Sequence, residues 1–198
     1  MTNRHGTIYS QAAVITVATR IKGVIFDGDG VLTNNRVLEG ISDVKPRWRS
    51  HYDGQGISLL RAIGIRICFI TNESGVAAEA IKGLVERWNN LPSCTSGVWS
   101  TVELFEGRGG ERKVEAAEKW LLQYNLCWAD CAVMGDDLVD VSMLRKAGLK
   151  VAPSSAELVV LGMAEFVSRR PGGSGAIRDL ANFILEMRNV DPTTLPTE

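Results

Sequence analysis

One stretch near the N-terminus limits the possible folds more than any other: an apolar run that ends in two carboxylates. Residues 21–26 read Ile-Lys-Gly-Val-Ile-Phe, and residues 27–30, Asp-Gly-Asp-Gly, follow directly. A short β-branched and aromatic run bounded by turn residues is typical of a buried strand. Two carboxylates packed at the end of such a strand repel each other and lose hydration, so they need a cation. The stretch therefore predicts a divalent metal site.

The composition is ordinary for one globular domain with a core of its own. The chain has 198 residues, of which 45% are hydrophobic and 23% charged, and its net charge is −1. Such a charge gives no electrostatic reason to bind nucleic acid or an anionic membrane surface. No apolar run is long enough to span a bilayer, and residues 12–18 lack the features of a signal peptide. We therefore expect a cytoplasmic protein with no nucleic-acid or membrane partner.

The cysteines argue for reduced thiols. Four are scattered along the chain, and Cys68 lies inside an apolar strand pattern. Cys127 and Cys131 have a spacing that could suggest zinc, but the two histidines, His5 and His51, are far away in sequence. The close pairs of ligands that zinc sites use are missing, so we expect no zinc.

Strand patterns alternate with helical patterns along most of the chain. Buried strands are predicted at residues 23–27, 66–70, 131–134 and 149–152, with amphipathic stretches between them. This alternation predicts a central parallel sheet with helices on both faces. The expected fold class is a Rossmann-like three-layer α/β/α domain. We divide the chain into an N-terminal lead-in (1–20), this domain (21–190) and a flexible tail (191–198).

The segment after the first strand is predicted to project from the domain. Residues 31–52 consist of short extended pieces broken by turn residues, which is typical of a β-hairpin flap, and a helix is expected only at 57–63. Between Asp29 and Thr71 there is space for this flap, a helix and a strand. A separate cap domain would need about 60 residues or more, so none is expected.

Polar residues of useful chemistry follow three of the strands. They are Asp27 with Asp29, Thr71 with Asn72, and Asp136 with Asp137, and Lys113 opens a helix between the second and third sets. The carboxyl ends of parallel strands meet at one edge of the sheet, so these groups can converge. Carboxylates suit Mg²⁺, while a lysine and a hydroxyl can hold phosphoryl oxygens. The set predicts a phosphate site.

These residues resemble the four motifs of the haloacid dehalogenase superfamily of phosphohydrolases. The chain is most similar to its small capless members, the 3-deoxy-D-manno-octulosonate 8-phosphate phosphatases and the C-terminal domain of acylneuraminate cytidylyltransferases. The resemblance runs from about Ile21 to Met187. It is carried by the following stretches: Asp-Gly-Asp-Gly-Val-Leu-Thr at 27–33, Asp-Gly-Gln-Gly at 53–56, Thr71, Lys113, Gly-Asp-Asp-Leu-Val-Asp at 135–140 and Gly-Gly-Ser-Gly-Ala-Ile-Arg at 172–178.

The resemblance implies catalytic roles for the first two aspartates. Asp27 would be the nucleophile, which forms an aspartyl phosphate and binds Mg²⁺. Asp29 would protonate the leaving alkoxide and then deprotonate water, and its backbone carbonyl would also bind the metal. Asp136 would complete the protein ligands of the metal. Asp137 and Asp140 would act as a further ligand or as support behind the ligands.

The resemblance also implies the substrate contacts. Thr71 and Lys113, with Asn72, would hold the phosphoryl group. Lys119 is the fallback for Lys113, because the stretch before Lys113 is longer than in the relatives. For Arg178 two interpretations stay open, an ordinary surface arginine or a ligand for the carboxylate of a sugar acid.

Several positions depart from the family pattern or stay open. Gly28 stands where the family has a bulkier apolar residue, which should loosen the turn between the two aspartates. The pair at 34–35, Asn-Asn, replaces Asp-Gly. Asp53 either starts a helix or has a role in the site, His51 is either a surface or a catalytic residue, and the glycine-rich loop at 172–175 is either a linker or a lid.

The function implied by the resemblance is Mg²⁺-dependent hydrolysis of a sugar-acid phosphate, of the 3-deoxy-octulosonate 8-phosphate or acylneuraminate 9-phosphate type. Related capless enzymes are homotetramers in which neighbouring subunits close the site, and we expect the same here. The alternative is an oligomerisation module with little or no turnover, associated with an acylneuraminate cytidylyltransferase. The intact set of acids argues against that alternative, because a purely structural module has no use for them.

Overall fold

The computed structural model describes residues 11–38, 46–196 and 198, and its centre is one parallel sheet. Six strands pair side by side in the order β3-β2-β1-β4-β5-β6, and every neighbouring pair is parallel. The predicted fold class, a Rossmann-like α/β domain with a central parallel sheet, is confirmed. The strands are β1 (Gly23–Phe26), β2 (Arg66–Ile70), β3 (Val102–Phe105), β4 (Cys131–Met134), β5 (Leu149–Ala152) and β6 (Phe166–Val167).

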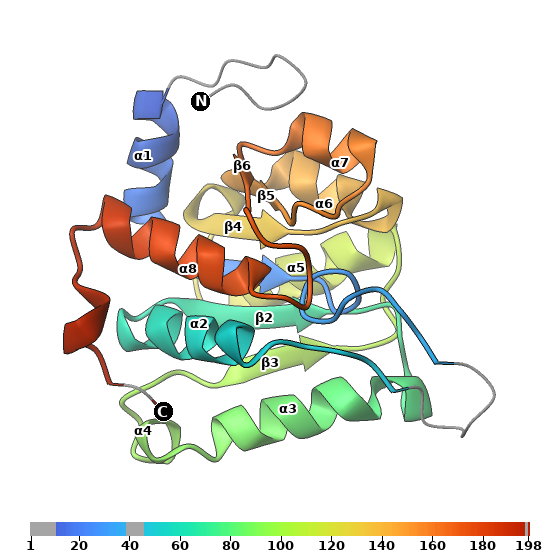
Figure 1. Cartoon of the computed structure of the whole chain (residues 1–198), viewed down its shortest axis with the longest axis horizontal. Coiled ribbons are helices and arrows are strands. Elements are labelled where there is room, and N and C mark those ends of the chain that lie inside the picture. Colours follow the sequence, from blue (N-terminus) through green and yellow to red (C-terminus); the bar gives the residue numbers. More distant parts are fainter. Residues whose placement is uncertain (1–10, 39–45, 197) are drawn as a thin grey trace.

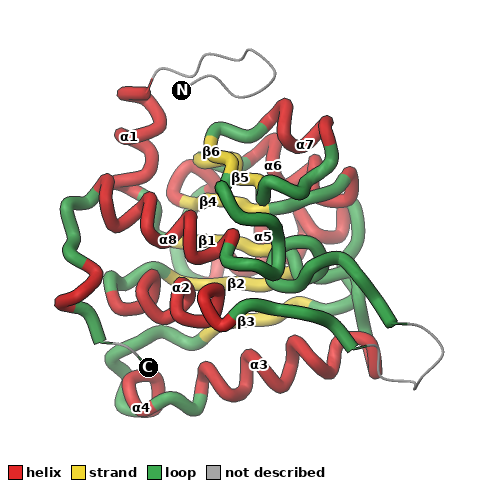
Figure 2. Tube along the Cα trace, viewed as in Figure 1, coloured by secondary structure: helices red, strands yellow, loops and turns green. Residues whose placement is uncertain are grey.

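Helices cover both faces of this sheet (Figures 1 and 2). Helices α2, α3 and α8 lie on one face, and α5, α6 and α7 lie on the other. Four single turns of 3₁₀ helix also occur, at Gly75–Ala78, Trp128–Asp130, Leu138–Asp140 and Pro192–Thr194. The α-helices are α1 (Gln11–Arg20), α2 (His51–Ala62), α3 (Glu79–Asn89), α4 (Pro92–Thr95), α5 (Glu111–Gln123), α6 (Val141–Lys146), α7 (Leu158–Met163) and α8 (Ala176–Met187).

Alternate residues of the strands build two separate cores. In β1, Val24 and Phe26 pack with α2, α3 and α8, whereas Ile25 packs with α5 and α6 on the opposite face. All three side chains are fully buried. Side chains along a strand point to opposite faces, so a sheet covered on both sides needs apolar residues at every position. This explains the uninterrupted apolar runs that predicted the strands.

The start of α2 corrects a predicted boundary. The helix begins at His51, six residues before the predicted start, because Ser50 caps it: its hydroxyl accepts a hydrogen bond from the backbone N–H of Tyr52 at 3.1 Å. Asp53 therefore lies in the first turn of the helix. Serine is among the preferred N-cap residues, and the glycines at 54 and 56 hid the helical pattern after it.

The predicted flap is described only in part. Residues 31–38 and 46–50 extend beyond the sheet edge without forming a strand, and residues 39–45 lie outside the described residues. An isolated bridge joins Asp29 and Thr33 at the base of the segment. Between β1 and β3 the described residues hold β2, the helices α2, α3 and α4 and short turns, without a separate cap domain. No described helix has the length and hydrophobicity to cross a membrane.

Candidate active site

Three buried aspartates meet where β1 and β4 end. Asp27 follows β1, while Asp136 and Asp140 lie in the turn after β4. One carboxylate oxygen of each lies within 4.8 Å of the others. The strands β1 and β4 are neighbours in register, so their carboxyl ends deliver these side chains to one point of the sheet edge. The structure thus brings together acids that are more than 100 residues apart.

Among the described residues, one lysine, Lys113, lies among these acids. Nζ of Lys113, from the first turn of α5, donates to Oδ1 of Asp140 at 2.6 Å and also to Oδ1 of Asp27. The side chain is fully buried, whereas Lys119 is exposed. The structure therefore places Lys113, and not the fallback Lys119, beside the predicted nucleophile.

The charges in this cluster do not balance. Burial and the carboxylate of Asp140 raise the pKa of Asp27 well above its usual value, although the Lys113 ammonium opposes this. Burial, with the carboxylates of Asp140 and Asp137, raises the pKa of Asp136 to about 7. Burial lowers the pKa of Lys113, but the carboxylates of Asp27 and Asp140 outweigh it and raise the pKa overall. Three carboxylates share one ammonium, so the cluster lacks positive charge.

The free oxygens of the cluster fit a divalent cation. Both oxygens of Asp140 are engaged, Oδ1 by Lys113 and Oδ2 by the backbone N–H of Asp136 at 3.0 Å. Asp140 therefore holds Lys113 and the turn after β4. Among the described residues, no hydrogen bond to Oδ2 of Asp27 is present, and Oδ2 of Asp136 accepts one from Asn35 at 3.3 Å, so both carboxylates can still bind a metal. In phosphate sites, Mg²⁺ is usually bound by one or two carboxylates, by water molecules and by oxygens of the substrate.

The side chain of Asp29 lies outside this cluster. Its Oδ1 accepts a hydrogen bond from the Thr33 hydroxyl at 2.7 Å and lies 2.5 Å from Nε of Arg47. The side chain of Asp29 is 24% exposed, in contrast to the buried Asp27. Two neighbouring carboxylates thus have different surroundings, which is the arrangement that separates a nucleophile from an acid and base.

Gly28 is held more tightly than the sequence suggested. Its carbonyl accepts hydrogen bonds from the N–H groups of Leu32 and Thr33 at 2.9 and 3.1 Å. A Cβ atom at position 28 would lie 3.1 Å from Cβ and Oγ1 of Thr71, which is a tight contact. The missing side chain is therefore matched by the close approach of Thr71. The expected looseness of this turn is not seen.

One glycine, Gly30, and one asparagine, Asn35, shape the site around Asp136. Gly30 has φ +85°, and a Cβ atom there would overlap the Asp136 carboxylate, at 1.9 Å from Oδ2. The side-chain amide of Asn35 donates to the same oxygen at 3.3 Å. The sequence pointed to Asn35 only as a departure from the family pattern, because nothing local connects it with a residue 101 positions away.

The remaining predicted residues lie around the cluster. Thr71 is buried, and its Oγ1 accepts a hydrogen bond from the N–H of Glu73 at 3.2 Å. Asn72 is exposed and turned toward Gly109, in the loop that precedes Lys113. Asp137 caps the turn after β4 by accepting from the N–H of Leu138 at 2.6 Å.

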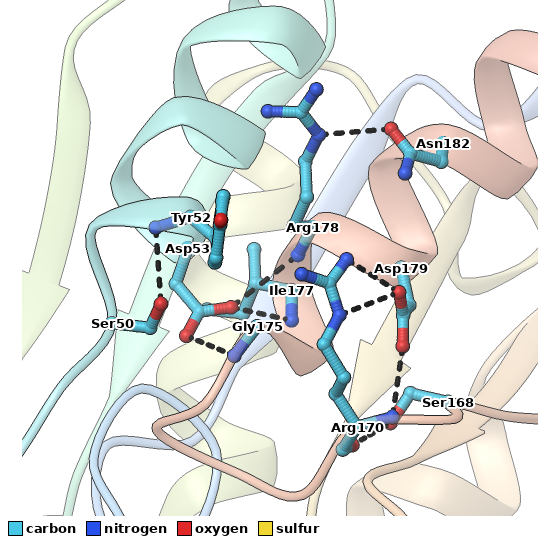
Figure 3. Close-up of polar contacts among 10 residues, drawn as sticks. All are labelled: Ser50, Tyr52, Asp53, Ser168, Arg170, Gly175, Ile177, Arg178, Asp179 and Asn182. Atoms are coloured by element: carbon cyan, nitrogen blue, oxygen red, sulfur yellow. Dashed lines mark hydrogen bonds and ion pairs between the residues drawn. The ribbon is translucent and has the colours of Figure 1, made fainter.

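Arg178 lies at a different cavity. It lines a cavity of ≈ 520 Å³ with Ser50, His51, Tyr52 and Gln55, and its Nε donates to Asn182 at 2.9 Å. Figure 3 shows its side chain running along α8 between α2 and Asn182. No hydrogen bond or ion pair between Arg178 and the three aspartates is present among the described residues. The structure brings Arg178 and the exposed His51 together with each other, and not with the cluster.

Asp53 joins α2 to α8 (Figure 3). Its carboxylate accepts hydrogen bonds from the N–H groups of Gly175 and Ile177, both at 2.9 Å, and of Arg178 at 3.3 Å. It is fully buried, and burial raises its pKa to about 6 although these N–H groups lower it. Asp53 therefore caps the start of a helix more than 120 residues away, a role that its own neighbours in sequence did not indicate.

The glycine-rich loop before α8 supports the turn at residues 30–34, which follows the two aspartates Asp27 and Asp29. Gly173 donates its N–H to the carbonyl of Val31 at 2.9 Å, and Gly172 packs directly on the carbonyl of Gly30. Asp53 thus fixes, through α8, the loop on which residues 30–34 rest.

Comparison with protein families decides the class of this fold. A family model described as haloacid dehalogenase-like hydrolase matches residues 18–176, which include the whole cluster. The chain belongs to this family.

Relatives of this hydrolase include two kinds of protein. The 3-deoxy-D-manno-octulosonate 8-phosphate phosphatase KdsC of Escherichia coli strain K12 is 28% identical over 174 residues, which cover 88% of this chain and 84% of that protein. N-acylneuraminate cytidylyltransferase B of Danio rerio is 28% identical over 159 residues, which cover 80% of this chain but 34% of that protein. The predicted resemblance and the predicted enzyme class, a haloacid dehalogenase-type phosphatase, are confirmed.

A solved structure shares the fold of this hydrolase. The 3-deoxy-D-manno-octulosonate 8-phosphate phosphatase from Moraxella catarrhalis, in complex with magnesium ion, phosphate ion and KDO, has a TM-score of 0.78 at 20% sequence identity. The match covers 91% of this chain and 94% of that one. At 20% sequence identity, this similarity shows that the two chains share a fold.

Proposed function

We propose that this hydrolase is a Mg²⁺-dependent phosphatase that cleaves phosphate monoesters through a phosphorylated Asp27. The observation that carries the proposal is the buried cluster of Asp27, Asp136 and Asp140, in which Lys113 is the one cation paired with the acids among the described residues. Phosphoryl transfer depends mainly on positioning and on neutralising charge, and this cluster lacks the positive charge of a divalent ion. When bound, Mg²⁺ would be held by Asp27 and Asp136 and would neutralise the phosphoryl oxygens.

The residues of the chain divide the reaction into two displacements. In the first, a carboxylate oxygen of Asp27 attacks phosphorus, the bond to the leaving oxygen breaks, and Asp29 gives that oxygen a proton. In the second, Asp29 takes a proton from water, the water oxygen attacks phosphorus, and the aspartyl bond breaks to release phosphate. Lys113 holds Asp27 in place and screens the incoming phosphoryl charge, with Thr71 as a further donor.

The proposed substrate is a sugar-acid phosphate of the 3-deoxy-octulosonate 8-phosphate or acylneuraminate 9-phosphate type. The names of the relatives support this class. The fold supports it too, because no cap domain among the described residues encloses the site and a substrate larger than phosphate can reach it. Arg178 stays a candidate ligand for the acid group of the substrate.

Three further predictions belong to this proposal. We infer a homotetramer, in which neighbouring subunits close the open site, and light scattering in solution tests it. The division of the chain at residues 20 and 190 and a cytoplasmic location stay predictions. The alternative, an oligomerisation module with little turnover, differs from the proposal in one observable, the release of phosphate.

The decisive experiment compares the wild type with Asp27→Asn. Phosphate release is measured from a panel of sugar-acid and simple sugar phosphates, with Mg²⁺ and with a chelator. We expect Mg²⁺-dependent release by the wild type and a loss of at least about 10³-fold in Asp27→Asn, because an amide is not a nucleophile here. No release by a folded wild type loaded with Mg²⁺ would refute the proposal and favour the oligomerisation module.

A further inference from the structure

One arginine of the segment before α2 is buried against the predicted acid and base. Nε of Arg47 lies 2.5 Å from Oδ1 of Asp29, and the side chain of Arg47 is only 6% exposed. Its Nη1 donates to the carbonyl of Ala77 at 3.4 Å, and its Nη2 lies 3.5 Å from Oε1 of Glu73. Arg47 thus links the carboxylate that follows β1 to the connection that follows β2.

The contacts on Asp29 are distributed unevenly between its two oxygens. Thr33 and Arg47 both approach Oδ1, at 2.7 and 2.5 Å. For Oδ2, no hydrogen bond to the part of the chain that the structure describes is present. A hydrogen bond from Thr33 and an ion pair with Arg47 on the same oxygen hold the carboxylate in one orientation, and they leave the other oxygen available for a proton.

We propose that Arg47 is a positioning residue for Asp29: together with Thr33 it holds Oδ1, so that Oδ2 is the oxygen that exchanges the proton. This rests on the proposed function. In the first displacement the proton passes from Oδ2 of Asp29 to the leaving oxygen as the bond from that oxygen to phosphorus breaks. In the second, Oδ2 takes a proton from the attacking water. Arg47 itself neither gives nor takes a proton.

The burial of Arg47 explains why an arginine suits this position. A guanidinium presents several donors in a fixed plane, so one side chain can contact Asp29, Glu73 and a carbonyl at the same time. A small cavity of ≈ 30 Å³ lies beside these groups and is lined by Asp29, Arg47, Thr71 and Glu73, among others. Without the guanidinium, water would enter this space and only the Thr33 hydroxyl would hold Oδ1 of Asp29.

The proposal predicts a dependence on the leaving group. An alkoxide leaves poorly without a proton, whereas p-nitrophenolate leaves readily without one, so only the alkyl ester needs a well-placed Asp29 in the first displacement. The value of kcat/KM reports the steps up to that displacement. In Arg47→Ala we expect kcat/KM to fall about tenfold to hundredfold for a sugar phosphate and less than about threefold for p-nitrophenyl phosphate.

Controls separate this role from a structural one. Arg49→Ala removes a neighbouring arginine whose Nη1 donates to the carbonyl of Ser50. This substitution should leave kcat/KM unchanged for both the sugar phosphate and p-nitrophenyl phosphate. Arg47→Lys keeps the charge and one donor, so it should restore part of the activity on the alkyl ester. The affinity for Mg²⁺, measured by calorimetry without substrate, should stay within about threefold of the wild type in Arg47→Ala.

The outcomes are distinct. A loss confined to the alkyl ester, with recovery by the lysine variant, supports the proposal. Equal losses on both esters would overturn it, because they indicate a role in binding phosphate or in folding. Unchanged activity on both would overturn it as well. If the wild type hydrolyses neither ester, the proposed function fails, and that result differs from all the others.

Discussion

The buried aspartates of this domain have two opposite kinds of surroundings. Asp53 is fully buried but accepts hydrogen bonds from three backbone N–H groups at the start of α8. Asp27 and Asp136 are almost as buried, but both lie close to the carboxylate of Asp140, and the Lys113 ammonium pairs with Asp27 and Asp140. Burial raises the pKa of both groups: to about 6 for Asp53, where the N–H donors oppose it, and to about 7 for Asp136, where the neighbouring carboxylates add to it.

This difference distinguishes an acid that stabilises the fold from acids that are suited to bind a ligand. A buried acid that is fully hydrogen-bonded stabilises the fold and has no need of a ligand. A group of buried acids with too few partners costs stability and persists where a ligand completes it. In this chain the first kind holds α2 against α8, and the second kind is the candidate metal and phosphate site. Substitutions in the cluster and at Asp53 test this distinction.

The largest effect is expected at Lys113. In Lys113→Met the three carboxylates keep no partner charge, so the metal-free protein should lose about 3–5 kcal/mol in free energy of unfolding at pH 8. The loss should shrink at pH 5.5, where protons replace the ammonium, and added Mg²⁺ should recover part of it. Chemical denaturation at the two pH values measures this. Lys146→Met is the control, because Lys146 pairs with Glu118 at an exposed position and should have little effect.

The next effect is expected at Asp53. In Asp53→Ala the first N–H groups of α8 lose their acceptor, which should cost about 2 kcal/mol in free energy of unfolding. The hydrogen bonds of Asp53 go to the start of α8 and not to the carboxylates of the cluster, so the substitution should change stability and leave the affinity for Mg²⁺ unchanged. Asp191→Asn, at an exposed cap, is the matched control. If Asp53→Ala abolished Mg²⁺ binding in a folded protein, the two kinds of buried acid would not be separable.

A smaller effect is expected from pH. Asp136 has a folded-state pKa of about 7 against a usual value of 3.8, so without metal its contribution to stability falls as the pH rises through this range. Mg²⁺ binds the ionised form, so its affinity should rise with pH and be about thirtyfold weaker at pH 5.5 than at pH 8. Thermal unfolding with and without Mg²⁺ at several pH values measures both trends. In Asp136→Asn the stabilisation by Mg²⁺ should itself be lost at every pH.

Much of the site could be predicted from the sequence because it depends on strand ends. Apolar runs identified β1, β2 and β4, and the parallel sheet brought Asp27, Thr71 and Asp136 to one edge. Lys113 was found because it opens a helix next to that edge.

The contacts that the sequence did not reveal connect distant segments. The capping of α8 by Asp53 spans more than 120 residues, and only the packing of α2 along α8 creates it. Arg47 reaches Asp29 through a segment without regular structure, whose path no periodic pattern specifies. Asp140 was expected as support, but its hold on Lys113 depends on a turn whose shape is set by Gly135, packed against the Asp140 side chain.

A calorimetric titration with Mg²⁺ at pH 7.5, without substrate, tests the central distinction most directly. The wild type and Asp53→Asn should each bind one Mg²⁺ per chain with similar affinity, whereas Asp136→Asn should show no binding in the same range. A folded wild type that takes up no Mg²⁺, or an Asp136→Asn variant that binds as tightly as the wild type, would contradict the account.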